Sequence, residues 1–246
     1  MGGRVFIGTS GYVYPHWRGP FYPAELPQRA WLPFYAERFD TAELNNPFYR
    51  LPEAERFQAW RQAVPKGFVF AVKVSRYITH VKRLKDVGQP LRTFLTRAKR
   101  LGPSLGPILF QLPGNFKVDI NRLNALCAWL DKQRTVPGLR AVLEVRHPSW
   151  LEPGIFDRLS EANMALCLAD WHELPVEDPV TADFVYLRRH GTGVRYGGSY
   201  PDGMLRGDAT RLRSWLETRR DVYIYFNNDQ AAFAVQNARR LMELMS

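Results

Sequence analysis

The stretch "VYIYFNND" (residues 222–229) changes from apolar to polar within a single step. Its first five residues, Val222 to Phe226, are β-branched or aromatic, which is typical of a buried strand. Three polar residues follow directly, and a turn would explain them because Asn and Asp favour turns. The same kind of ending recurs along the chain, however, and this recurrence predicts the fold.

Short apolar runs alternate with amphipathic stretches along the chain, which is the pattern of repeated βα units and a parallel sheet. Strands are expected over residues 5–10, 41–45, 68–74, 107–112, 141–146, 165–170, 184–190 and 222–227. The clearest helices are expected over residues 28–38, 53–63, 89–101, 119–132, 153–162, 208–219 and 229–244. No linker divides residues 1–246, so the sequence predicts a single α/β domain, a (β/α)8 barrel of TIM type with one irregular unit at 171–183. A doubly wound open sheet is the alternative.

The composition is that of a globular protein with an excess of positive charge. Of 246 residues, 46% are hydrophobic, and 34 Lys and Arg outnumber 24 Asp and Glu. The excess favours anionic partners such as phosphate esters or nucleic acid, although a basic proteome would also explain it. Cys127 and Cys167 lie in apolar patterns and are expected to be buried and unpaired. No leader precedes the first strand and no apolar run approaches the roughly 18 residues of a membrane span, so a cytoplasmic protein is expected.

Side-chain alternation along the expected strands gathers polar residues at their carboxyl ends. In a barrel of this type those ends form the face that carries catalytic groups. The expected inward sets are Thr41, Glu43 and Asn45; Val69, Ala71, Lys73 and Ser75; Leu109 and Gln111; Val142, Glu144 and Arg146; Leu166, Leu168 and Asp170; Tyr186, Arg188 and His190; and Tyr223, Tyr225 and Asn227. A network of ion pairs that only closes the barrel would explain this ring. Because buried ion pairs are often no more stabilising than apolar packing, the repetition favours a functional pocket.

The residues at these strand ends also belong to longer motifs. These read "IGTSGYVYPHWRGPFYP" (7–23), "TAELNNPFYRLP" (41–52), "FAVKVSRYITH" (70–80), "ILFQLPGNF" (108–116), "LEVRHPSW" (143–150), "YLRRHG" (186–191) and "YFNNDQAAFAVQNA" (225–238). In order and over essentially the whole chain, they resemble the motifs of the YecE-like family, also called DUF72. The resemblance implies a TIM-type barrel and no particular reaction, because the family has no established one. After "FNND" relatives usually place a glycine where this chain has "QAAFA", which indicates an altered start of the last helix.

Three loops offer ligand contacts. The glycine-rich segment 190–203, with Arg195 and the nearby Arg188, is a candidate phosphate cradle or simply a flexible loop. The segment 73–86 interleaves Arg76, Tyr77 and His80 with further cations, which suits nucleic acid or a solvated surface. Tyr12 follows the first strand and would stack a ligand ring or help to fix its own loop.

The candidates for acid–base chemistry are Glu43, Glu144 and Asp170, with His147 and His190 nearby. Neighbouring charges would push the pKa values of these groups apart, as an acid and a base acting together require. The alternative for His147 is a purely structural role. Glu144, Asp170 and His190 would also suit Mg²⁺, Mn²⁺ or Zn²⁺, but arginines project into the same volume, so no metal site is predicted. No motif assigns a cofactor or an oligomeric state.

Two familiar barrel chemistries are disfavoured. A glycosidase with carboxylates after the fourth and seventh strands is disfavoured, because Gln111 and Arg188 or His190 occupy those places, although other carboxylate pairs remain open. A Schiff-base role for Lys73 would need that amine desolvated or beside another cation. We expect instead an ion pair between Lys73 and Glu43.

The sequence therefore predicts an enzyme, a hydrolase or lyase that acts on a phosphorylated or nucleic-acid-derived substrate. The expected catalytic residues are Glu43, Glu144, Asp170 and His190. The expected substrate-binding residues are Tyr12, Asn45, Lys73, Arg76, His80, Gln111, Arg146, His147, Arg188 and Asn227. A non-catalytic module that holds nucleic acid or a nucleotide on its basic face is the alternative. In the opening stretch, Asn227 is expected to face the pocket, Asn228 to point away, and Asp229 to cap the last helix.

Overall fold

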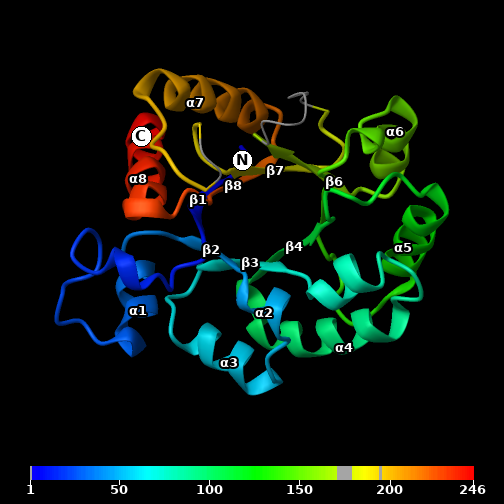
Figure 1. The fold of residues 1–246 in the computed structure, drawn as a ribbon, viewed down its shortest axis with the longest axis horizontal. Coiled ribbons are helices and arrows are strands. Elements are labelled where there is room, and N and C mark those ends of the chain that lie inside the picture. The colour runs from blue at the N-terminus through cyan, green and yellow to red at the C-terminus, as the bar shows by residue number, and fades with distance from the viewer. Residues whose placement is uncertain (1, 171–178, 194–195) are drawn as a thin grey trace.

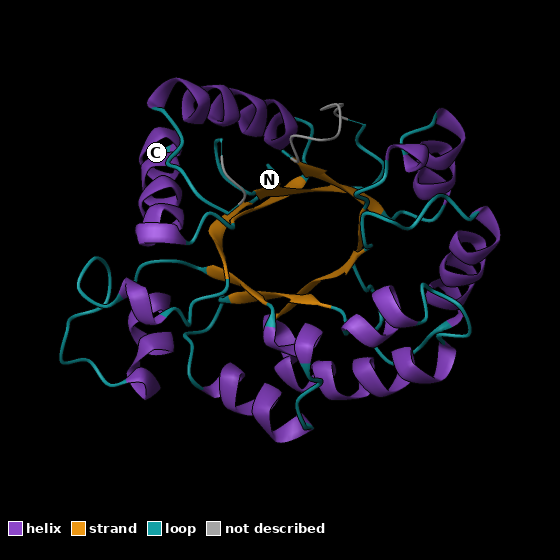
Figure 2. Ribbon diagram, in the orientation of Figure 1, coloured by secondary structure: helices purple, strands orange, loops and turns teal. Residues whose placement is uncertain are grey.

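Eight parallel strands close into a barrel in chain order in the computed structural model, which describes residues 2–170, 179–193 and 196–246. The strands are β1 (Val5–Ser10), β2 (Thr41–Leu44), β3 (Val69–Lys73), β4 (Leu105–Gln111), β5 (Ala141–Glu144), β6 (Ala165–Ala169), β7 (Phe184–Arg189) and β8 (Asp221–Phe226). β8 pairs with β1 as well as with β7, so no strand edge is left open. Figure 2 shows the closed ring of strands with the helices outside it. The predicted TIM-type barrel is confirmed, and the open sheet is wrong.

The helices follow the strands around the outside of the ring (Figure 1). They are α1 (Trp31–Ala36), α2 (Asn46–Tyr49), α3 (Ala54–Gln62), α4 (Gly88–Ala98), α5 (Ile120–Lys132), α6 (Pro153–Glu161), α7 (Asp202–Glu217) and α8 (Phe233–Met245). α5 begins after Asp119, as predicted, because the Asp119 side chain accepts a hydrogen bond from the backbone N–H of Arg122. α7 begins at Asp202 rather than at 208, and the expected helix at 28–38 is shortened to α1 after a 3-10 turn. The expected irregular unit at 171–183 falls mostly on residues 171–178, which lie outside the described residues.

Two apolar layers make up the core, one between the strands and the helices and one inside the barrel. The inner layer consists of Phe6, Ala71, Leu109, Val142, Ala165, Cys167, Phe184, Tyr186, Tyr223 and Tyr225. Within it the rings of Phe6 and Tyr223 stack with their centroids 4.7 Å apart. This plug fills the amino-terminal part of the barrel, so the polar ends of the strands lie above a closed floor. Both cysteines are buried and free, as expected.

The alternation predicted for the sixth strand is wrong. Leu166 and Leu168 pack in the outer layer, and Cys167 lies inside the barrel. The strand reads "ALCLA", which is apolar on both faces, so only Asp170, directly after the strand, indicates which side chains face inward. A shift by one residue reverses the facing of every side chain in a strand, and the short apolar run contains nothing that would fix it.

The connection between β8 and α8 also differs from the prediction. Asp229 does not cap α8, which begins only at Phe233. The backbone carbonyl of Asp229 instead accepts hydrogen bonds from His16 Nε2 (2.7 Å) and Trp17 Nε1 (2.9 Å). Asp229 therefore fastens the loop after β1 to the end of β8, and the buried Trp17 fixes this loop.

Ala231 and Ala232, in the turn that leads into α8, adopt left-handed backbone conformations with φ of 52° and 60°. The motif resemblance implies a glycine within this stretch, "QAAFA". An L-residue with a Cβ pays roughly 1–2 kcal/mol in this region, whereas glycine does not.

We predict that Ala231→Gly stabilises the fold by about 0.5–1 kcal/mol, because relief of the left-handed strain exceeds the extra chain entropy of glycine. Urea unfolding measures the difference. The matched control is Ala125→Gly at an exposed position within α5, which we expect to destabilise by about 1 kcal/mol. Equal destabilisation by both substitutions would contradict the strained turn.

Candidate functional site

Glu43 is the last inward side chain of β2, and its carboxylate is completely buried. Oε1 accepts hydrogen bonds from Ser10 Oγ (2.5 Å) and from Arg188 Nη2 (2.9 Å). Oε2 accepts one from the hydroxyl of Tyr186 (2.6 Å). Both oxygens are therefore engaged by groups of the barrel wall, which leaves Glu43 with little capacity to contact a ligand.

Arg188 joins two carboxylates that come from separate parts of the barrel. Nη2 bonds to Glu43, on β2, and Nη1 donates to Glu144 Oε2, on β5, at 2.7 Å. Burial lowers the pKa of Arg188, but Glu43 and Glu144 outweigh it and raise that pKa well above its ordinary value. The guanidinium therefore stays charged and links the carboxyl ends of β2, β5 and β7.

Glu144 is held by a second arginine on its other oxygen, since Arg146 Nε donates to Oε1 at 2.9 Å. Burial would raise the pKa of Glu144, but Arg188 and Arg146 lower it well below its usual range. A carboxylate with so low a pKa is a weak proton acceptor near neutral pH. Glu144 is therefore better suited to orient the two arginines than to act as a general base.

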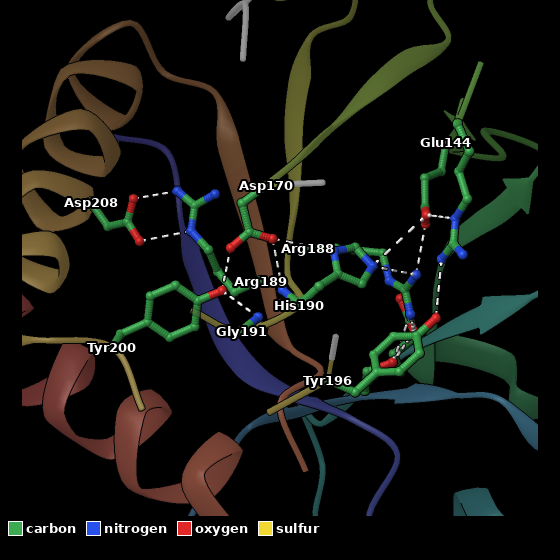
Figure 3. Close-up of polar contacts among 12 residues, drawn as sticks. Glu144, Asp170, Arg188, Arg189, His190, Gly191, Tyr196, Tyr200 and Asp208 are labelled. Atoms are coloured by element: carbon green, nitrogen blue, oxygen red, sulfur yellow. Dashed lines mark hydrogen bonds and ion pairs between the residues drawn. The ribbon is translucent and has the colours of Figure 1, made fainter. Parts of the chain in front are cut away.

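His190 lies between Asp170 and Arg188, and the contacts form a continuous chain (Figure 3). Asp170 Oδ1 accepts from the backbone N–H of His190 (2.7 Å) and lies 3.2 Å from its Nδ1. Arg188 Nη1, which can only donate, lies 3.3 Å from His190 Nε2. These neighbours assign the ring proton to Nδ1. Burial lowers the pKa of His190, more than Asp170 raises it, so the imidazole is neutral.

The loop that follows β7 is fixed by the same group of residues. The Tyr200 hydroxyl donates to Asp170 Oδ2 and accepts from the backbone N–H of Gly191 at 2.7 Å. Asn228 points away from the barrel interior, as predicted, and donates to the carbonyl of Gly198 at 2.8 Å. Two backbone N–H groups that a phosphate cradle would use, those of His190 and Gly191, already have protein acceptors. Arg195, the other cation expected in this cradle, lies outside the described residues.

Lys73, at the end of β3, is buried, and its Nζ lies 4.0 Å from the centroid of the Phe48 ring. No ion pair among the described residues includes Lys73, so the expected pair with Glu43 is wrong. Glu43 is unavailable because Arg188, Ser10 and Tyr186 already occupy its oxygens. Burial, and then the positive charge of Arg188, lower the pKa of Lys73 to about 7.

A cavity of about 780 Å³ opens at the carboxyl ends of the first three strands and β7 and β8. Five residues predicted for the site line it: Tyr12, Asn45, Lys73, Arg188 and Asn227. Five more, Glu43, Glu144, Arg146, Asp170 and His190, form the network around Arg188 and do not line it. The structure therefore separates the predicted site into a cavity wall and a charged support behind it.

The remaining predicted residues do not line the cavity and make no hydrogen bond to the network around Arg188 in the described part of the chain. The Gln111 amide donates to the carbonyl of its neighbour Leu112 at 2.5 Å. His147 accepts from the backbone N–H of Ser149 and so caps the turn at Pro148–Trp150, a structural role. His80 packs its ring against Phe48 with centroids 5.0 Å apart, and burial lowers its pKa to about 4. Arg76 is exposed and does not line the cavity.

Several contributors were missed by the sequence reasoning. Ser10 bonds to Glu43, Asn45 and Arg188, and the same alternation applied to the first strand would have found it. Arg56 and Trp60 line the cavity from α3. They follow a strand by more than ten positions, so strand-end reasoning gives no signal for them. Arg50 and Tyr49, after β2, also line the cavity.

Within residues 2–170, 179–193 and 196–246, no group of three His, Cys, Asp or Glu side chains is placed to hold a metal ion. Glu144, Asp170 and His190 are engaged instead with Arg188, Arg146 and Tyr200. No helix in the described part of the chain is long and apolar enough to cross a membrane.

A closed barrel of eight parallel strands with a polar cavity at their carboxyl ends places this chain among the TIM-barrel proteins. More specifically, the chain belongs to the family described as "Protein of unknown function DUF72", whose model matches residues 6–246. The resemblance seen in its motifs is thereby confirmed.

This chain is similar to individual proteins over nearly its full length. The UPF0759 protein YunF of Bacillus subtilis is 23% identical, with 98% of this chain and 94% of that protein covered. The structure of a DUF72 family protein from Thermotoga maritima is 26% identical, with a TM-score of 0.86 over 98% of this chain and 99% of that one. The structure of a DUF72 family protein from Enterococcus faecalis is 20% identical, with a TM-score of 0.82 over 98% and 95%.

The network around Arg188 generates a prediction for stability. Glu144→Gln removes the anionic partner of two buried arginines, so we expect a loss of about 3–5 kcal/mol in the free energy of unfolding. Glu161→Gln is the matched control, because Glu161 also faces an arginine, Arg158, but is 70% exposed; we expect a change within about 0.5 kcal/mol.

The loss of stability caused by Glu144→Gln should depend on pH. The folded pKa of Glu144 is below its unfolded value, so the stabilisation is complete above about pH 4.3 and is lost as the pH falls through the folded pKa. The difference between wild type and Glu144→Gln should therefore shrink in acid. A difference independent of pH, or no larger than that of the control, would contradict the charged network.

Proposed function

We propose that this chain is an enzyme, a hydrolase or lyase, that acts on a phosphorylated or nucleic-acid-derived small substrate in the cavity beside Arg188. The observation that carries the proposal is the buried amine of Lys73 in the cavity wall, which has no carboxylate partner among the described residues. In its protonated form this amine has no carboxylate to offset its charge, which favours an anionic ligand.

The charges around the cavity support an anionic substrate. Arg50, Arg56, Lys73 and Arg188 line it, and the ion pairs of the described residues include neither Arg50, Arg56 nor Lys73. The two acidic residues in the wall, Glu53 and Asp229, face Arg97 and His16 respectively. The cavity wall therefore carries an excess of positive charge.

The aromatic residues of the wall support a substrate with a ring or a sugar. Tyr12, Tyr14, Tyr49 and Trp60 line the cavity together with Asn45 and Asn227. Aromatic rings bind the faces of bases and sugars, and amides select the orientation of a polar edge. This combination suits a nucleotide-derived or sugar-derived phosphate.

Proton transfer is assigned to Lys73 rather than to Glu144. An efficient general acid or base has a pKa close to the working pH. The pKa of Lys73, lowered by burial and Arg188 to about 7, meets this condition. Glu144 and Glu43 hold Arg188 in place, while Asn45 and Asn227 orient the substrate.

Turnover of a panel of phosphomonoesters and phosphodiesters tests the proposal. We expect Lys73→Met to reduce kcat/KM for any substrate found by about 100-fold or more, the usual contribution of a general acid or base. Lys132→Met, at the end of α5 and far from the cavity lining, is the control and should leave turnover unchanged. Absence of turnover in the wild type across the panel, or equal turnover in Lys73→Met, would overturn the proposal.

A second function, binding of single-stranded nucleic acid without turnover, is favoured by one observation. Tyr49 and Tyr77 are 80% and 52% exposed, and the neighbouring cations Arg50 and Arg76 are exposed too. The ring contact of Phe48 with His80 brings the two segments that carry these tyrosines together. Exposed aromatic rings beside cations are the usual surface for stacked bases.

Fluorescence anisotropy with a labelled single-stranded oligonucleotide separates this second function from the first. If it holds, affinity falls steeply with salt, and Tyr49→Ala costs about 1–3 kcal/mol, or roughly 5- to 150-fold in Kd. Ile120→Ala, at an exposed apolar residue of α5, is the control and should bind like the wild type. Salt-independent or undetectable binding would exclude the nucleic-acid module.

A further inference from the structure

Lys73 combines three features that an amine nucleophile needs. Its side chain lines the cavity, so a ligand can reach it. It is buried, which favours the uncharged amine over the ammonium, and this effect opposes the cation–π contact of Nζ with the Phe48 ring at 4.0 Å. No carboxylate among the described residues pairs with it, so no partner holds its proton in place.

We propose that Lys73 Nζ forms an imine with an aldehyde or ketone group of an anionic substrate. The inference rests on the proposed function, because it uses the same cavity and names the reacting group of its substrate. A lysine becomes competent for this reaction when it is desolvated or lies beside another cation. Lys73 meets the first condition, because it is buried in the cavity wall, and the charge of Arg188 lowers its pKa in the same direction.

The reaction balances without any further reagent. The Nζ lone pair attacks the carbonyl carbon, the C=O π electrons move to oxygen, and a proton passes from nitrogen to that oxygen to give a carbinolamine. Loss of the hydroxyl group together with the remaining proton on nitrogen, as one water, then leaves the imine, which takes up a proton. When a bond at the carbon next to the protonated imine breaks, its electron pair forms the enamine, and the other fragment leaves as a carbonyl compound after its hydroxyl proton passes to water, which is lyase chemistry. A proton then adds to the enamine carbon, and hydrolysis of the imine with one water returns the free amine and a carbonyl product.

Asn45 supplies a second recognition element next to Lys73. The strand register pairs Leu44 with Val72, so Asn45 and Lys73 follow at the same level of neighbouring strands. Asn45 Nδ2 donates to Ser10 Oγ at 2.9 Å, because the single hydroxyl proton of Ser10 goes to Glu43. Asn45 Oδ1 is therefore left as a buried acceptor without a partner among the described residues.

That oxygen defines the substrate more closely. A buried acceptor without a donor costs free energy, so the site favours a ligand that donates to it. A hydroxyl group beside the carbonyl, or the hydroxyl of the carbinolamine, meets this requirement. Arg50 and Arg56 in the same cavity wall suit an anionic group at the far end of the ligand. The chemistry therefore points to a hydroxyaldehyde or hydroxyketone that carries a phosphate.

Reductive trapping tests the proposal on the full chain. The protein is incubated with glyceraldehyde 3-phosphate and sodium cyanoborohydride at pH 7, and the modified lysine is located by peptide mass mapping. Ordinary lysines with a pKa near 10.4 are almost fully protonated at this pH, so we expect Lys73 to react about tenfold or more faster than any other lysine. Its rate should rise through pH about 7, the value to which burial and Arg188 lower its pKa.

Two variants and two opposite outcomes make the test decisive. Lys73→Met should lose the selective label, and Lys132→Met should keep it; if Lys73→Met fails to fold, the map of the wild type alone carries the result. A label spread over the exposed lysines, with Lys73 unmodified, overturns the imine. If Lys73 is unmodified while a phosphate ester is still turned over in a Lys73-dependent manner, the imine fails and the proposed function stands.

Discussion

The bridge from Glu43 through Arg188 to Glu144 is the interaction on which the rest of this site depends. It crosses the barrel from β2 to β5, and both oxygens of Glu43 and both terminal nitrogens of Arg188 have a partner of opposite charge or a hydroxyl group. Buried charges are tolerated only when they are paired and hydrogen-bonded in this way. Two consequences follow. The oxygens of Glu43 and Glu144 accept hydrogen bonds from protein donors, and the positive charge of Arg188 acts on Lys73, which has no carboxylate partner in the described chain.

The sequence raised two explanations of the polar ring, an ion-pair network that closes the barrel and a functional pocket. The geometry accommodates both, in different residues. Glu43, Glu144 and Arg146 belong to the network, whereas Asn45, Lys73 and Asn227 line the cavity beside it, and Arg188 belongs to both. Such a division is physically reasonable, because a cavity with an unpaired amine needs rigid support from side chains that are held by several hydrogen bonds and ion pairs.

Much of the fold could be predicted, because it follows from the alternation of side chains within each strand and from the repetition of strand–helix units along the chain. Eight short apolar runs separated by amphipathic stretches specify parallel strands, and the alternation within them placed Lys73, Arg188 and Asn227 correctly. It failed on β6, where both faces are apolar and the pattern carries no information. The sequence could not show that Lys73 forms no ion pair with Glu43. The side chains of Ser10, Tyr186 and Arg188 all bond to Glu43, and only the distances in the structure reveal this. Arg56 and Trp60 enter from a helix, which strand-end reasoning does not reach.

Membership of the DUF72 family and the TIM-type fold are established by the family model and the barrel topology, and the chemistry has to be argued from the cavity. The central claim is that Lys73 is an amine of near-neutral pKa. A titration of ¹³C-labelled lysine side chains by NMR, with Lys73→Met to assign the resonance, measures this directly. The account predicts a midpoint at pH about 7, caused by burial and by Arg188. A midpoint near the ordinary lysine value of about 10.4 would contradict it.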